Sequence, residues 1–182
     1  MLGRLIAKIN VKRNNDAVRP EGFINGQGIC TVHSFRFGLG TVAANGCGAI
    51  AVYNALKLCG YTADFTKIAS GLEKSGLVLF GWLGVAPDGI GRYFRKAEIS
   101  ARKLHRYDEF VKSLENGGVY ILCYWTRKPW RSTSHFVAIE HRDGNNIVYN
   151  LYNNSKTERP VGDIANICNE GQFIRAYVME KK

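Results

Sequence analysis

Cys47 stands between two glycines in the stretch Ala44-Asn45-Gly46-Cys47-Gly48 and opens an apolar run. The apolar residues that follow recur at helical spacing, so a helix is expected to start at this cysteine. In the first turn of a helix, unpaired backbone N–H groups and the positive end of the helix dipole both favour an anion. The sequence therefore predicts a Cys47 thiol with a lowered pKa that acts as a nucleophile, with its own N–H in an oxyanion hole.

The other four cysteines lie within apolar strand or helix patterns, where cysteine behaves as a small buried hydrophobe. They are Cys30, Cys59, Cys123 and Cys168. Five scattered cysteines, with no pair at zinc-ligand spacing, predict free thiols in a reducing compartment. No disulfide framework, metal or other cofactor is expected.

A thiol nucleophile needs a base, and His135 stands at the head of an apolar strand pattern, SHFVAIE. Asn150 follows fifteen positions later on the next strand pattern, and the turn Asp143-Gly144-Asn145-Asn146 predicts a hairpin that brings both residues to one open end. The amide oxygen of Asn150 is expected to hold one ring nitrogen of His135 and fix its tautomer. Taken alone, His135 has a plainer interpretation as a core or edge histidine bonded to backbone.

The order of Cys47, His135 and Asn150 resembles that of the papain-like cysteine peptidases. Within that superfamily the chain is most similar to the bacterial peptidases that cut double-glycine leader peptides from bacteriocins. The matching segments are NGCGAIAVYNALKLCG (45–60) and SHFVAIEHRDGNNIVYNLYN (134–153). The resemblance implies a papain-like fold and hydrolysis of a peptide or amide bond through a Cys47-His135-Asn150 triad and a thioester.

Two positions depart from the family pattern. Papain-like enzymes usually carry an oxyanion-binding glutamine six residues before the nucleophile, where this chain has Thr41. Asn45 is the local substitute, whereas Gln27 would need a long excursion of the chain to reach the same place. Leader peptidases also commonly place an aspartate directly before the cysteine, where this chain has Gly46.

The elements that would position these residues form an α+β arrangement, with helices first and an antiparallel sheet second. Helices are expected from Cys47, after Asp64, from Pro87 or Asp88 and from Tyr107, and the helix of the nucleophile would pack on the sheet. Strands are expected at 29–37, 118–125, 134–142, 145–153 and 171–181. The 182 residues fit a single domain, with 1–25 as a peripheral N-terminal segment.

The formal net charge of +10 allows an acidic partner. We expect Trp130 and Arg131, in the basic segment before His135, to form one wall of a cleft for an acidic or carboxylate-bearing peptide. A solvent-exposed connection is the alternative for this segment. No membrane-spanning segment or secretory signal is recognisable, so a cytoplasmic protein without a membrane partner is expected.

Three classes of function remain open. They are a thiol enzyme, either a hydrolase or an acyltransferase on the same fold; a catalytically inactive papain-like domain that binds a peptide; and a basic nucleic-acid-binding domain. The nucleic-acid interpretation rests on charge alone, because aromatic and basic residues do not interleave in any recognised motif. The oligomeric state is left open.

Overall fold

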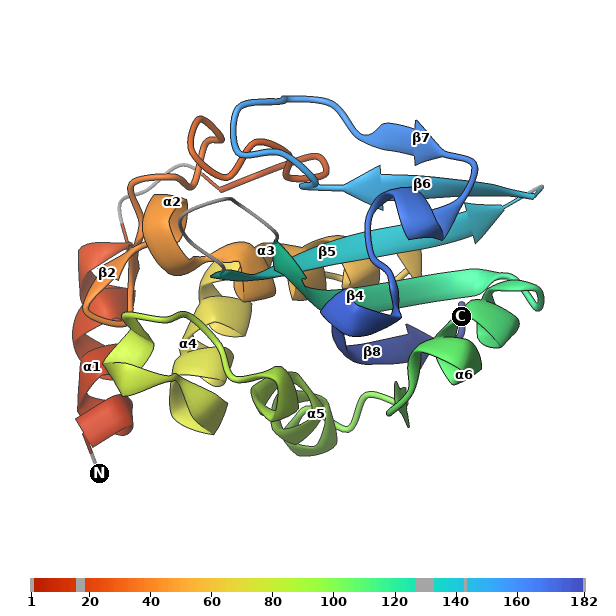
Figure 1. The fold of residues 1–182 in the computed structure, drawn as a ribbon. Helices are drawn as coiled ribbons and strands as arrows, with labels where there is room; N and C mark the ends of the chain where they lie inside the picture. Colours follow the sequence, from red (N-terminus) through yellow and green to blue (C-terminus); the bar gives the residue numbers. More distant parts are fainter. Residues whose placement is uncertain (1, 16–18, 127–132, 143, 182) are drawn as a thin grey trace.

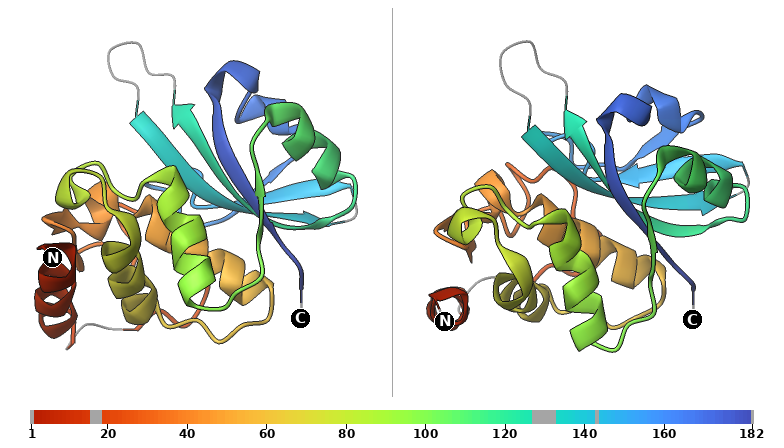
Figure 2. Two further views of the ribbon diagram at one scale, coloured as in Figure 1. Left: turned by 90° about the horizontal axis from the view of Figure 1, so that it is seen from below. Right: turned by 60° about the horizontal axis from the view of Figure 1, so that its bottom comes forward.

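A six-stranded antiparallel sheet lies between two groups of helices in the computed structural model (Figure 1), which describes residues 2–15, 19–126, 133–142 and 144–181. The strand order is β3-β8-β4-β5-β6-β7. Helices α1, α3, α4 and α5 lie on one side and α6 on the other (Figure 2). The strands are β3 (Arg102–Leu104), β4 (Gly118–Thr126), β5 (Thr133–Arg142), β6 (Asn145–Tyr149), β7 (Arg159–Val161) and β8 (Phe173–Met179). The longer helices are α1 (Leu2–Arg13), α3 (Cys47–Leu58), α4 (Phe65–Gly76), α5 (Pro87–Lys96) and α6 (Tyr107–Leu114). The α+β class expected from the sequence is therefore confirmed.

All four expected helix starts are confirmed, and local chemistry explains two of them. The side chain of Asp64 accepts a hydrogen bond from the Lys67 N–H and caps α4. Pro87 occupies the first position of α5, where its missing N–H costs nothing. Gly60 ends the turn after α3 with a φ of +80°, a conformation that favours glycine.

Four of the five expected strands are confirmed as β4, β5, β6 and β8. The pairing of β5 with β6 runs from Ala138↔Tyr149 to Arg142↔Asn145, as the predicted hairpin requires. The sheet also includes β3 and β7, which the sequence did not indicate. Each has only three residues, too few for alternation of apolar and polar residues to be recognised.

The strand expected at 29–37 is wrong. The segment forms successive turns closed by local bonds, including His33 N–H to the Cys30 carbonyl and Phe35 N–H to the Val32 carbonyl. Only its last two residues pair, as β1 (Arg36–Phe37) with β2 (Gly40–Thr41). Turns that repeatedly bury one apolar residue produced an alternation that the sequence alone could not distinguish from a strand.

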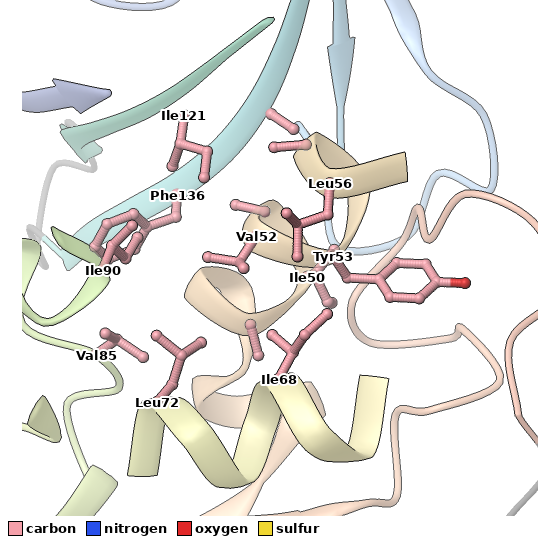
Figure 3. Packing of buried hydrophobic residues seen from close by; sticks show 14 of the residues in the cluster. Ile50, Val52, Tyr53, Leu56, Ile68, Leu72, Val85, Ile90, Ile121 and Phe136 are labelled. Atoms are coloured by element: carbon pink, nitrogen blue, oxygen red, sulfur yellow. The ribbon is translucent and has the colours of Figure 1, made fainter. Parts of the chain in front are cut away.

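Helix α3 is the centre of the hydrophobic core on one face of the sheet (Figure 3). Every residue from Gly48 to Leu56 is buried. Phe136 and Ala138 of β5 belong to this core, whereas Val137 and Ile139 belong to a second core on the α6 face. The alternation along β5 thus decides which of its side chains can meet α3.

Candidate functional site

Cys47 is the first residue of α3, and its N-cap, Gly46, has no side chain to cover the helix start. The Cys47 side chain is half-buried and packs against the core between α3 and the sheet. Backbone N–H groups of Phe136, Gly48 and Cys47 itself lie close enough to the sulfur to lower the pKa of the thiol. The sulfur therefore lies against β5, at the residue that directly follows His135.

Burial nevertheless raises the pKa of the Cys47 thiol, because desolvation outweighs the three N–H groups. The expectation of a lowered pKa is wrong in this respect. The helix start supplies only partial charges, and its surroundings disfavour a thiolate more than those charges favour it. A thiol that is protonated at neutral pH needs a base to take its proton during attack.

The Cys47 side chain packs on the α3 face of the sheet, whereas the His135 ring lies on the opposite face. Both residues are close to the same edge of β5. The ring of His135 packs edge-on against Tyr124, its partner on β4, with ring centroids 6.0 Å apart. β6 pairs with β5 only as far as Ala138, so it leaves the edge beside residues 135–137 to other groups. The Cys47 sulfur lies beside the Phe136 N–H, and the main-chain carbonyl of Asn150 bonds to the side chain of His135.

The main-chain carbonyl of Asn150 lies 2.8 Å from Nε2 of His135. A carbonyl oxygen can only accept, so Nε2 carries the proton, and in the neutral ring Nδ1 carries the lone pair. Asn150 thus fixes the tautomer as expected, but with its backbone and not with its amide. The amide oxygen is already used, because it accepts a bond of 3.0 Å from the Gln27 N–H.

Asn150 is held in a left-handed conformation, with a φ of +60°, just after β6 ends. Its N–H donates to the side chain of Asn25 over 2.7 Å, while Gln27 binds its amide oxygen. The segment that contains Asn25 and Gln27 is held in turn by Asn54 of α3. The Asn54 amide makes two bonds of 2.8 Å with the backbone of Ile24. A chain of buried contacts therefore runs from α3 through residues 24–27 to Asn150 and His135.

Of the two oxyanion candidates, Gln27 is the one whose side chain bonds to the segment that leads to Cys47. Its Nε2 donates to the Ala43 carbonyl over 3.0 Å, four residues before Cys47. Residues 28–41 form the long loop that separates Gln27 from the segment before Cys47. This loop ends in the β1–β2 hairpin, which leads into α2. Asn45 turns its amide nitrogen toward the hairpin, because a Cβ at Gly40 would lie 2.6 Å from that nitrogen. Thr41, at the family's usual glutamine position, is the N-cap of the short helix α2 (Val42–Asn45).

The glycines on both sides of Cys47 allow neighbouring residues to pack closely against the start of α3. A Cβ at Gly46 would lie 2.6 Å from a methyl group of Val42, and a Cβ at Gly48 would lie 3.1 Å from Val85. Gly48 and Val85 thus bring the glycine-rich segment 76–91 against α3. In these two directions the missing side chains are filled by neighbouring residues and leave no room for a substrate.

Two expected substrate-binding residues, Trp130 and Arg131, lie outside the described residues. Sequence reasoning missed Asn25 and Asn54, which hold the backbone of the site. Their only signal was the presence of an amide side chain in an apolar helix or a loop, and such residues are common.

The described part of the chain contains no group of three or more His, Cys, Asp or Glu side chains arranged to hold a metal ion. No helix within that part has the length and apolar character that crossing a membrane requires. Comparison of the chain with protein-family models gives no match, and comparison with curated proteins gives none either. Any functional argument therefore depends on the geometry of this site.

Proposed function

We propose that the protein is a thiol-dependent hydrolase that cleaves a peptide or amide bond by a papain-like mechanism. The observation that carries the proposal is the shared edge of β5. There the Phe136 N–H approaches the Cys47 sulfur, and Nε2 of the preceding residue, His135, binds the Asn150 carbonyl over 2.8 Å. A thiol and a histidine close to one strand edge, with the histidine nitrogen selected by a third group, are the parts that this reaction needs.

The first step follows from the tautomer. Nδ1 of His135 takes the thiol proton of Cys47 as the sulfur attacks the substrate carbonyl carbon. The resulting oxyanion is stabilised by N–H groups in the first turn of α3 and by the amide nitrogen of Gln27. The carbon–nitrogen bond then breaks, and the proton passes from His135 to the leaving amine. Water, with His135 again as base, hydrolyses the thioester and restores the thiol.

The test is cleavage of a mixed peptide pool, followed by mass spectrometry of both the peptides and the intact protein. We expect products with the parent protein and, after rapid acid quenching, an acyl adduct on Cys47. Cys47→Ala and His135→Ala should each lower the rate at least about a thousandfold. His33→Ala is the matched control, because His33 is exposed, and it should leave the rate unchanged.

The other function classes predict different results. An inactive peptide-binding domain would retain peptides without cleaving them and would show no adduct on Cys47. An acyltransferase would form the adduct but release it only when an amine is added. Binding to duplex DNA that weakens steeply with salt, without any adduct, would overturn the proposal in favour of the nucleic-acid class.

A further inference from the structure

A cavity of about 820 Å³ opens beside His135. The end of β4, the start of β5, the loop after β6, strand β7 and the segment before β8 surround it. Its volume lies within the range of roughly 300–1,000 Å³ that is usual for small-molecule sites. His135 belongs to its lining, so the cavity is continuous with the proposed catalytic edge.

The described lining contains one permanently charged side chain, Arg159 at the start of β7, and no carboxylate. The Arg159 guanidinium lies over the ring of Tyr152, 5.9 Å from its centroid. No ion pair between described residues involves Arg159. A planar guanidinium presented in this way is suited to a carboxylate, which it can bind through two parallel hydrogen bonds.

The rest of the lining combines an apolar part with neutral hydrogen-bonding groups. Leu151, Val161 and Ile167 provide the apolar part, and the amides of Asn153 and Gln172 are among the polar groups. The lining thus suits a ligand that carries one anionic group on a partly apolar body. An amino acid or a short peptide with a free carboxylate has this composition.

The direction of proton transfer decides which half of the substrate the cavity would hold. In the proposed reaction His135 gives its proton to the nitrogen that leaves when the carbon–nitrogen bond breaks. The leaving half must therefore lie beside His135, whereas the acyl half stays on Cys47. The cavity is on the His135 side.

We infer that this cavity binds the leaving half of the substrate and that Arg159 binds a carboxylate on it. The inference rests on the proposed hydrolase function for its catalytic meaning. The substrate is then an amide whose leaving group is an amino acid or a short peptide that ends in a free carboxylate. Cleavage exchanges the carbon–nitrogen bond for a carbon–sulfur bond, and the thiol proton ends on the released amine.

The test is binding of phenylalanine and of phenylalanine amide to the Cys47→Ala protein, measured by NMR titration. The two probes differ only in the carboxylate. We expect phenylalanine to bind about threefold to fivefold more tightly than its amide, because the exposed Arg159 guanidinium can pair with the carboxylate and not with the neutral amide. Arg159→Ala should remove this preference, and Arg159→Lys should keep part of it. Arg95→Ala removes the same charge from an exposed position on α5 and should change nothing.

Equal binding of the two probes, no detectable binding of either, or no effect of Arg159→Ala would each overturn the inference. The binding assay uses a protein without the nucleophile, so it is independent of catalysis. If phenylalanine binds as expected but Cys47 forms no adduct, the hydrolase proposal fails and the carboxylate site remains. If peptides are cleaved but Arg159→Ala affects acids and amides equally, only the carboxylate site fails.

Discussion

At the scale of single residues, the site depends on which atoms of Asn150 and Cys47 are used. Asn150 holds His135 through its main-chain carbonyl and has a φ of +60°, while its side chain binds Gln27. Cys47 lies at a helix start, yet burial raises the pKa of its thiol. Both facts differ from a triad built on an amide oxygen and a preformed thiolate, and both can be tested.

Asn150→Gly should retain more activity than Asn150→Ala. Glycine keeps the carbonyl and adopts a φ of +60° freely, whereas alanine in the left-handed region costs about 1–2 kcal/mol. The measurements are the rate of peptide cleavage and the free energy of unfolding of both variants. If the amide oxygen held His135, the two variants would be equally inactive.

Alkylation of Cys47 by iodoacetamide should become faster as the pH rises, without a plateau near neutral pH. A raised pKa means that the thiolate, which is the reactive form, is a minor species until the pH exceeds the ordinary value of about 8.5. Peptide mapping of the labelled protein gives the rate at each pH. Cys30, which is also half-buried and also has a pKa raised by burial, is the internal control. A plateau of the Cys47 rate below pH 7 would show a preformed thiolate and contradict this prediction.

At the scale of elements, α3 has two functions. Its first turn carries the thiol, and its second half holds residues 24–27 through Asn54. Asn25 and Gln27 in that segment bond to Asn150, directly after β6. These bonds fix the main-chain carbonyl of Asn150 that binds His135. Cys47 and the Asn150 carbonyl that binds His135, the groups of the proposed reaction, therefore depend on the same helix.

Asn54→Ala should destabilise the fold and lower activity together. The change removes two bonds to Ile24 and leaves a buried N–H and a buried carbonyl without these partners, which costs about 2–5 kcal/mol. Urea unfolding gives the free energy, and peptide cleavage in the absence of urea gives the activity of the folded fraction. Asn116→Ala, at an exposed position after α6, should change stability by no more than about 0.5 kcal/mol. If the folded Asn54→Ala protein kept full activity, α3 would not be needed to position His135, and this prediction would be wrong.

At the scale of the whole molecule, the sheet separates two hydrophobic cores, and the thiols are divided between them. Cys59 and Cys123 are buried in the core on the α3 face, and Cys168 is buried on the α6 face. Burial raises the pKa of all three, to about 11 for Cys59 and about 12 for Cys168. Cys30 and Cys47 are half-buried, and all five thiols are free.

A thiol–disulfide reagent at pH 8 should therefore distinguish two groups of cysteines. Cys30 and Cys47 should react in the folded protein, whereas Cys59, Cys123 and Cys168 should react only at the rate of global unfolding. In denaturant all five should react at once. If all five thiols reacted at a single rate in the folded protein, the three buried cysteines would be as accessible as Cys30 and Cys47, and this prediction would be wrong.

Much of the fold could be read from local pattern. The starts of four helices, the hairpin of β5 and β6 and the late position of the sheet follow from capping residues, proline, glycine and periodicity. The false strand at 29–37 and the unrecognised strands β3 and β7 show the limit of such patterns. Short turns and three-residue strands carry too little periodicity to be distinguished locally.

The sequence by itself determined the residue types and their order along the chain: a cysteine at a helix start, a histidine at the head of a strand and an asparagine after the next strand. Only the tertiary structure decided that the carbonyl of Asn150, not its amide, binds His135. It also decided that the Gln27 side chain bonds to the Ala43 carbonyl, four residues before Cys47, and that burial, not the helix start, sets the direction of the Cys47 pKa shift. The physical reason is that hydrogen-bond partners and desolvation depend on which segments meet in space. Neither quantity is encoded by the spacing of residues along one chain.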